Sequence, residues 1–418
     1  MMEEGINFDF EQYINNYQGR TRLNRAFFIA DSCPSIAVEA LQFALQYITQ
    51  ETHSIELYEA CLEKLNLALS QRQQPAMELN RQWMETTSDN NKTRLAQLER
   101  ELKTYRSNMV KESIRVAQTK LGDYYYDVGN LTEASRNFTK TREFCTTSKN
   151  MLDLCFNMIK VHMESDQHHH LASYVARAEV IPQLPDKANT MSTLRCYQAI
   201  STLFTGDTNA FTSVGQLLTQ QVTIEASAVI NQVLSANDVA IYGGLCALAS
   251  MDRRALQDLL NTNTQFRAFL ELEPQVREIM ELFQSSKYAA CFTLLETLKP
   301  TWKLDMYLSP HIDSIIQHIR EKAMVQYCLP YSSIDLRSMA QAFNTDVETV
   351  EEDLVQLIGQ KKKITARIDS HDKILYTKRQ NERSQAFDQS MNLGEEYENA
   401  ARSIMLRVNL VKADMVIR

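Results

Sequence analysis

Apolar residues recur every three or four positions through most of the chain, which is the spacing of helices that bury one face. Within the first 75 residues this pattern predicts two paired helices joined by a polar connection at 49–53, with Pro34 at the first turn of the first helix. The apolar positions are Ile36, Ala40, Phe43, Ala44 and Tyr47 in the first helix, then Ile55, Tyr58, Leu62, Leu65 and Leu69 in the second. The run TTSDNN at 86–91 is rich in capping and turn residues and predicts a break.

A long helix is predicted beyond that break, with a charged outer face and an apolar seam. The seam consists of Leu95, Leu98, Leu102, Tyr105 and Met109. It fits either a coiled-coil dimer or a helix that packs on its own chain. Two heptads are too few for a coiled-coil assignment, which favours packing on the same chain.

The clearest internal pattern lies at 117–145. Leu121-Gly122, Tyr125, Gly129, Ala134 and Phe138 occupy the Leu-Gly, Tyr, Gly, Ala and Phe positions of a tetratricopeptide repeat. Small residues allow two antiparallel helices to approach closely, and Gly129 permits the turn between them. The segment is therefore predicted to be a helical hairpin.

Two weaker copies follow, each about 40 residues after the one before. The second is marked by Met158, His162, Asp166, Leu171, Val175 and Ala178, and the third by Phe204-Thr205-Gly206-Asp207, Phe211 and Leu218. Units of this length cannot bury their apolar faces alone, so they stack into a curved solenoid. Such solenoids generally bind proteins.

Helical patterning continues from 236 to 328. Pro274, preceded by Glu273, predicts the start of a helix. Pro300 and Pro310 are expected to bracket a short irregular stretch.

After Pro330 the pattern changes. Ile334, Leu336, Met339 and Phe343 predict a short helix, and a capping box of Thr345 and Glu348 opens a second one. Two β-rich segments then flank a polar turn at 370–373, as in a hairpin. Helix, turn, helix and hairpin predict a winged-helix module at about 329–378, the only part of the chain where strands are expected.

The tail from about 382 is predicted to be a single helix. Its apolar seam consists of Tyr397, Ala401, Ile404, Val408, Val411 and Met415. Folding back on its own domain and insertion into a groove or bundle of other helices both fit this seam.

The composition supports a mainly α fold. Ten Gly and eight Pro in 418 residues are too few for a sandwich or barrel, which needs turns every ~8–12 positions. The 52 Asp and Glu exceed the 44 Lys and Arg, which argues against a protein whose main partner is nucleic acid. The eight Cys are scattered singly, as buried thiols are in a reducing compartment. No signal peptide and no apolar run of 18 residues is present, so an intracellular protein without a membrane partner is expected.

No motif in the sequence predicts an active site, a metal or a cofactor. His168-His169-His170 is expected to lie in a solvated loop at the turn of the second repeat, because consecutive His residues on a helix point in different directions. His311 and His318 are two helical turns apart, too far to chelate one ion. Gly243-Gly244 alone is not a phosphate-binding loop. The chain is therefore predicted not to be an enzyme.

The charges of the winged-helix module bear on nucleic-acid binding. Eight basic residues against three acidic ones lie in 361–383, so the wing is basic. The helix that would enter a DNA groove instead carries Asp346, Glu348, Glu351, Glu352 and Asp353, which phosphates would repel. This favours a protein-pairing module over a nucleic-acid-binding one.

Helical repeats that lead into a winged helix and a terminal helix resemble the PCI proteins, which are scaffolds of the proteasome lid, the COP9 signalosome and an initiation-factor complex. Within them, several stretches resemble the subunit 1 family of the signalosome. They are FIADSCPSIAVEAL (28–41), LGDYYYDVGNLTEAS (121–135), YGGLCALAS (242–250), FLELEPQVRE (269–278) and ITARIDSHDKILYTKR (364–379). Lys361-Lys362-Lys363 departs from the more apolar, Gly-containing approach to the wing that this family leads one to expect.

The resemblance implies a non-catalytic scaffold subunit of a complex that removes NEDD8 from cullins and so regulates cullin–RING ubiquitin ligases. The expected partners are other signalosome PCI subunits, the separate metalloprotease subunit and cullin–RING ligases, in the nucleus and cytoplasm. Together with the repeat pattern, the resemblance implies four segments. They are an N-terminal helical arm (1–110), TPR-like repeats (111–211), a PCI domain (212–380) and a C-terminal bundle helix (381–418).

Two sets of side chains are expected to bind neighbouring subunits. The pairing edge of the wing comprises Ile364, Ala366, Ile368, Ile374 and Tyr376, and the bundle helix uses the apolar seam of the tail. Two alternatives remain: a proteasome-lid PCI subunit, and a PCI protein that binds nucleic acid through the basic wing.

Overall fold

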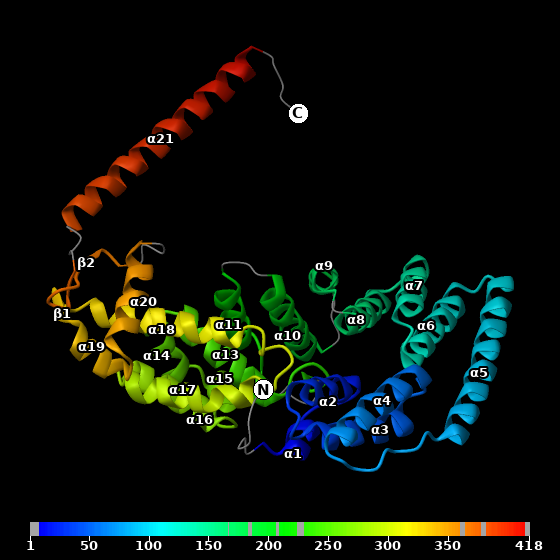
Figure 1. The fold of residues 1–418 in the computed structure, drawn as a ribbon. Helices are drawn as coiled ribbons and strands as arrows, with labels where there is room; N and C mark the ends of the chain where they lie inside the picture. Colours follow the sequence, from blue (N-terminus) through cyan, green and yellow to red (C-terminus); the bar gives the residue numbers. More distant parts are fainter. Residues whose placement is uncertain are drawn as a thin grey trace. The chain divides into compact units, whose positions relative to one another are not determined.

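The computed structural model describes residues 8–165, 167–182, 186–205, 209–223, 230–359, 364–377 and 382–413. Helices make up most of this part of the chain (Figure 1), and the predicted mainly α class is confirmed. By its internal contacts the chain divides into two compact units, Met1–Lys322 and Ala323–Arg418. The four segment boundaries expected from the sequence stay predictions.

The first unit begins with an N-terminal helical arm. Its helices are α1 (Phe10–Asn15), α2 (Arg20–Ser32), α3 (Ala37–Glu51), α4 (Ile55–Gln71) and α5 (Arg81–Ser107). The predicted pair is confirmed as α3 and α4, and the apolar residues of α1 to α4 share one buried core. Pro34 lies in the turn between α2 and α3, before the helix that it was expected to open.

The predicted break at 86–91 is wrong, because α5 runs through these residues. Their polar groups find partners without interrupting the helix. The Thr86 hydroxyl donates to the backbone oxygen of Gln82 at 2.9 Å, and the Asn91 amide donates to the backbone oxygen of His53 at 2.9 Å. Capping residues favour a helix end only where the backbone lacks partners, and here the tertiary contact to His53 removes that preference.

The apolar seam of α5 packs on the same chain. Leu102 is buried, and Leu95 and Leu98 pack with it against α6 (Lys111–Val128). Met109 lies beyond the end of α5 and is exposed, so the seam is shorter than its sequence spacing indicated. Packing on the same chain, the favoured alternative, is confirmed.

Three helical hairpins follow, as the repeat pattern predicts. They pair α6 with α7 (Leu131–Thr141), α8 (Ser148–Glu164) with α9 (His168–Glu179), and α10 (Lys187–Thr205) with α11 (Ala210–Gln220); a short 3₁₀ helix, η1 (Arg142–Phe144), follows α7. Asp166, Gly206 and Asp207, which mark the second and third copies, lie outside the described residues. Figure 1 shows these helices following one another in chain order.

Two glycines make the first hairpin possible. A Cβ at Gly122 would lie 2.5 Å from the ring of Phe138, so only glycine allows α6 and α7 to approach this closely. Gly129 ends α6 in the left-handed region with φ 96°, and its N–H and that of Asn130 bond back to the last turn of the helix.

Replacing Gly129 with valine is expected to lower the free energy of unfolding by about 1–3 kcal/mol, because a β-branched residue is strained at positive φ. A Cβ would also lie 3.0 Å from the Ser54 hydroxyl on the arm. Urea unfolding of the full chain measures the loss. Gly394→Ala, at an open position of the C-terminal helix, is the control and should not destabilise the chain. An unchanged midpoint for Gly129→Val would contradict the assigned turn.

The remaining helices of the first unit are α13 (Ala236–Ser250), α14 (Arg253–Asn261), α15 (Thr264–Leu270), α16 (Pro274–Gln284), α17 (Tyr288–Trp302) and α18 (Ile312–Cys328), the last of which continues into the second unit. Pro274 opens α16 as predicted. Pro300 was expected to begin an irregular stretch, but it lies in the last turn of α17. The helix extends two residues further because Trp302 is buried there.

The second unit contains the predicted winged helix: β1 (Ser333–Asp335), α19 (Leu336–Phe343), α20 (Val347–Gly359), β2 (Ala366–Asp369) and β3 (Ile374–Thr377). The strands form an antiparallel sheet in the order β1-β3-β2. Ile334, assigned from the sequence to a helix, belongs instead to β1 and pairs with Leu375. The Thr345 capping box is also wrong, because its hydroxyl is buried without a hydrogen-bond partner among the described residues. The chain's last described helix is α21 (Glu382–Lys412).

Candidate functional site

The first helices of the three repeats line one continuous groove. Side chains one turn apart on α6, α8 and α10 enclose an open space of about 560 Å³, which we call the repeat groove. They include Arg115, Thr119 and Asp123 on α6, Asp153, Asn157 and Lys160 on α8, and Asn189, Thr193 and Tyr197 on α10. Positions four apart share a helix face, so the sequence spacing of the repeats produces this lining directly.

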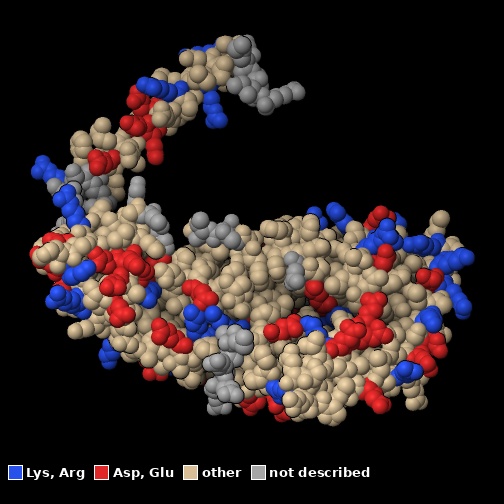
Figure 2. Space-filling model, in the orientation of Figure 1, with Lys and Arg blue, Asp and Glu red and all other residues tan. Residues whose placement is uncertain are grey.

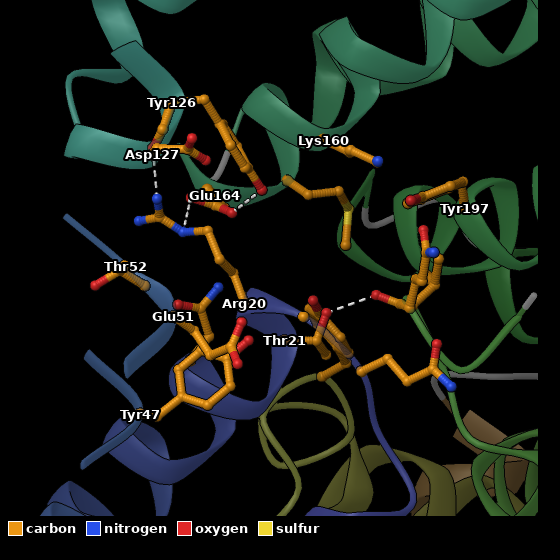
Figure 3. A pocket seen from close by; sticks show the side chains of 17 residues that line it. Arg20, Thr21, Tyr47, Glu51, Thr52, Tyr126, Asp127, Lys160, Glu164 and Tyr197 are labelled. Atoms are coloured by element: carbon orange, nitrogen blue, oxygen red, sulfur yellow. Dashed lines mark hydrogen bonds and ion pairs between the residues drawn. The ribbon is translucent and has the colours of Figure 1, made fainter. Parts of the chain in front are cut away.

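A second pocket of about 360 Å³ adjoins the repeat groove and shares Lys160, Tyr197 and Gln232 with it. Its other wall comes from the start of α2 and the end of α3 in the arm. Figure 3 shows Arg20 extending from α2 towards Tyr126 and Glu164. Arg20 forms an ion pair with Glu164 at 3.1 Å and donates to the backbone oxygen of Tyr126. The arm is thereby fastened to the repeats beside the groove.

The repeat groove and this pocket carry a surplus of negative charge. Two of their cations are already paired, Arg20 with Glu164 and Arg115 with Glu112 at 2.7 Å. The remaining lining carboxylates are Glu51, Asp123, Asp127, Asp153 and Asp186. Asp123 is an exposed residue, yet partial desolvation of its carboxyl and the neighbouring Asp127 raise its pKa to about 6, against the opposing effect of Lys160 and Arg94. The groove can therefore hold an extended segment through the Asn157 and Asn189 amides, and its charge favours cationic residues in that segment.

Asp123→Asn is expected to stabilise the chain more at pH 7.5 than at pH 4.5, by a difference of about 1–2 kcal/mol after solvent screening. A carboxyl with a raised folded-state pKa contributes stability below its ordinary pKa and loses it as the pH rises through about 6. Asparagine does not ionise, so the stability of the variant relative to the unmodified chain increases as the pH rises through about 6. Urea unfolding at both pH values measures the difference.

The exposed Asp89→Asn on α5 serves as the control for that comparison, with the same change in charge outside the groove. An advantage of Asp123→Asn that is equal at the two pH values would contradict the raised pKa of this carboxyl.

A buried ionic cluster joins the arm to the rest of the first unit. Arg25 on α2 is 1% exposed and contacts Asp238 on α13 at 3.0 Å and Asp305, in the turn after α17, at 2.5 Å. Tyr17 donates to Asp238 at 2.7 Å, and Tyr242 donates to Asp305. Each carboxylate thus has both a cation and a phenol as partners.

Mutual attraction favours the charged forms of Arg25 and Asp305, whereas at Asp238 burial outweighs the attraction of Arg25 and raises the pKa of that carboxyl. Burial by itself raises the pKa of Asp305, but Arg25 and the hydrogen bond from Tyr242 outweigh it and hold that pKa below its ordinary value. Burial works against the charge on Arg25, yet Asp305 and its neighbours raise the pKa of Arg25 well above its usual range. The cluster fixes Tyr17 and α2 on α13, and no local pattern in the sequence predicts it.

The hairpin residues predicted to bind neighbours lie on two faces of the sheet. Ile368 pairs with the fully buried Leu375, so Ile364, Ala366 and Ile368 face the core side. Ile374 and Tyr376 pair with Asp369 and Arg367 on the opposite face, where Tyr376 is exposed. β1 and β2 are the edge strands, and Ile364 is buried. Their role in pairing stays a prediction.

The acidic helix α20 neutralises part of the basic wing. Glu351 accepts hydrogen bonds from Lys373 and Ser370, each at 2.6 Å, and both contacts lower its pKa. Figure 2 shows acidic side chains gathered over α20. Lys361, Lys362, Lys363, Lys378 and Arg379 of the wing lie outside the described residues.

Helix α21 leaves its predicted seam open to solvent. Tyr397 is 77% exposed, Ile404 59%, Val408 47% and Val411 74%, while Ala401 is half-buried. Met415 lies outside the described residues. Phe387 and Met391, ten and six positions before Tyr397, are exposed as well. In the described part of α21 none of the large seam residues is buried, and both alternatives for the seam stay predictions.

The His residues serve in packing. His168, expected in a loop, opens α9 and stacks on Phe204 with ring centroids 4.1 Å apart, and His311 contacts the same ring. Within the described residues no group of three or more His, Cys, Asp or Glu could hold a metal ion. All eight cysteines are free thiols, and Gly243-Gly244 lies inside α13. None of the helices described has the length and hydropathy to cross a bilayer.

Comparison with known proteins identifies the family. Residues 80–259 match the 26S proteasome subunit RPN7 family and residues 295–379 match the PCI domain. COP9 signalosome complex subunit 1 of Arabidopsis thaliana is 37% identical over 98% of this chain and 91% of its own length. COP9 signalosome complex subunit 1b of Drosophila melanogaster is 33% identical over 99% of this chain and 87% of its own length. The chain belongs to the COP9 signalosome complex subunit 1 family.

A relative from the proteasome is more distant than these signalosome subunits. The 26S proteasome non-ATPase regulatory subunit 6 of Caenorhabditis elegans is 22% identical over 64% of this chain. The family resemblance inferred from YGGLCALAS and FLELEPQVRE is therefore confirmed. In a signalosome subunit, the repeat groove, the winged helix and the seam of α21 are candidate surfaces for contact with other subunits.

Proposed function

We propose that this chain is a non-catalytic scaffold subunit of the COP9 signalosome, the complex that removes NEDD8 from cullins and so regulates cullin–RING ubiquitin ligases. Its partners are other PCI subunits, which it contacts through its winged helix and α21, and the metalloprotease subunit that supplies the isopeptidase chemistry. The complex acts in the nucleus and the cytoplasm.

The open seam of α21 carries this proposal. Tyr397, Ile404 and Val408 form an apolar stripe that is exposed to water. Burying such a stripe against a partner would stabilise the assembly by roughly 1.5–3 kcal/mol per large side chain. A bundle of similar helices from several subunits is an arrangement that covers such a stripe.

The winged helix supports protein pairing over nucleic-acid binding. Its acidic helix α20 lies where phosphates would approach, and Lys373 of the wing is already paired with Glu351 at 2.6 Å. A nucleic-acid-binding wing requires cations free to contact phosphates.

Affinity purification of the full chain from native extract, followed by mass spectrometry of the intact complex, tests the proposal. A stoichiometric assembly of several PCI subunits with a metalloprotease and cullins is expected. Proteasome particles would transfer the chain to the lid, and a lone chain with bound nucleic acid would overturn the scaffold assignment. Fluorescence imaging of the tagged chain is expected to show it in both the nucleus and the cytoplasm.

A further inference from the structure

A pocket of about 440 Å³ opens on the repeats where α7, α8 and α9 meet. This volume lies within the ~300–1,000 Å³ range of pockets that hold ligands or anchoring side chains. Its floor is apolar and comes from α8, where Leu154, Cys155 and Met158 are buried and Met151 is partly exposed. Leu154 and Met158, with Met151 packed against them, belong to the core between the first and second repeats, so the floor is rigidly supported. We call this site the Met158 pocket.

The rim of the Met158 pocket carries two arginines. Arg142 follows the end of α7 and Arg177 lies on α9, and both side chains are exposed. Neither has a carboxylate partner in the described part of the chain, and no Asp or Glu lines the pocket. The Arg177 guanidinium lies 5.3 Å from the centroid of the Tyr174 ring, a cation–π contact that holds it at the pocket wall.

The lining of the Met158 pocket contains two positive charges and no negative one, although the whole chain has a net charge of −8. Figure 2 shows Lys and Arg side chains over α7 and the adjoining end of α5. Lys103, Arg106, Lys111 and Lys140 are exposed on α5, α6 and α7. Glu143 is exposed beside Arg142 but does not line the pocket. The local field therefore attracts acidic groups to an apolar site.

We propose that the Met158 pocket binds a short acidic segment of a partner protein, seating one apolar side chain on Met151 and Met158 while Arg142 and Arg177 bond the flanking carboxylates. Thioether side chains adapt to several apolar shapes, so the anchor is a Leu, Met or Phe. The planar guanidinium of arginine binds carboxylates through two parallel hydrogen bonds. The site would therefore recognise both the negative charge of the segment and its apolar side chain. A protein segment fits this site because one short, flexible peptide can place an apolar side chain and its flanking carboxylates next to each other.

The inference stands apart from the proposed scaffold role, since neither the winged helix nor α21 takes part. The test measures fluorescence anisotropy of labelled 12-residue peptides with the full-length chain. Each peptide has one central residue, which is Leu, Met, Phe or Ala. The flanking residues contain four acidic residues (Asp or Glu), four Lys, or Ser alone. Saturable binding is expected for acidic peptides with an apolar centre, and it should weaken as salt is raised.

The pocket is tested with the charge-reversal variant Arg142→Glu/Arg177→Glu, which changes exposed side chains and leaves the core intact. The dissociation constant of the best acidic peptide is expected to rise by about tenfold or more, because two charge-assisted contacts are lost. Arg81→Glu/Lys92→Glu makes the same change in charge at exposed positions nearer the other end of α5, outside the pocket lining, and is expected to change the constant less than threefold.

Three results would overturn the proposal. They are no binding of any acidic peptide at 1 mM, equal binding of the Ala-centred and apolar-centred peptides, and equal weakening by the two double variants. Inorganic phosphate and anionic vesicles are competitors in the same assay. Competition by phosphate or vesicles that matches the unlabelled peptide would show a general anion site instead of a peptide pocket.

Discussion

Replacing Arg25 with methionine is expected to lower the free energy of unfolding by about 3–5 kcal/mol at pH 7.5. The guanidinium is the cation shared by Asp238 and Asp305, and all three side chains are buried. Without it, two carboxylates remain in an apolar environment, with phenols as their only side-chain partners among the described residues. Urea unfolding followed by circular dichroism measures the loss, and limited proteolysis should show the arm cleaved earlier, because the cluster fastens α2 to α13.

The pH dependence of this loss identifies its electrostatic origin. In the intact cluster the lowered pKa of Asp305 contributes stability above the ordinary carboxyl range and loses it as the pH falls through that range. Burial already raises the pKa of Asp238 in the intact cluster. Without Arg25 the pKa values of both carboxyls are expected to rise, so the penalty for ionising them grows as the pH rises. The difference between the two proteins should therefore be smaller at pH 5 than at pH 7.5.

The triple variant Arg25→Met/Asp238→Asn/Asp305→Asn is the matched control for the Arg25 prediction. It removes the two orphaned charges and is expected to recover part of the loss, because a buried polar network without charge avoids the cost of an unpaired ion. A loss below about 1 kcal/mol in Arg25→Met, or the same loss at both pH values, would contradict the role assigned to the cluster.

The double variant Ile404→Asp/Val408→Asp is expected to abolish entry into the complex and leave the free chain as stable as before. Both side chains are exposed in the structure, so the fold does not depend on them. In a helical bundle each would lose the burial of a large apolar side chain, about 1.5–3 kcal/mol, and would bury a charge as well. Together these losses weaken assembly by two or more orders of magnitude.

Co-purification with the other subunits measures assembly, and the thermal midpoint of the free chain measures its fold. Asn399→Asp/Ser403→Asp is the matched control, with the same spacing on the opposite side of α21 and both positions exposed. It should enter the complex normally. Truncation after Arg383 should behave as the seam variant does, leaving a folded chain that does not assemble. A truncated chain that still co-migrates with its partners would disprove the role of α21 in assembly.

The sequence determined the elements that rest on local periodicity. The hairpin at 117–145 is recognisable from its two glycines. Gly122 is required where the two helices approach closely, and Gly129 is required at the left-handed turn. The winged helix is recognisable because two short segments with helical spacing follow Pro330 and two β-rich segments then flank the polar turn at 370–373. The seam of α21 is visible for the same reason, since its residues share one face through their spacing alone. These features need only the chain within about ten residues of each position.

Tertiary structure decided the features that depend on partners far along the chain. Helix α5 continues through TTSDNN because Asn91 finds a partner in the arm. Ile334 joins a strand because β3, some forty residues later, offers it a ladder position. Arg25, Asp238 and Asp305 form one cluster, and the Met158 pocket combines residues of three helices. The physical reason is that a buried charge or a pocket is stable only when side chains from separate elements supply its partners. Sequence periodicity shows which face of an element is apolar, but not which other element will pack against that face.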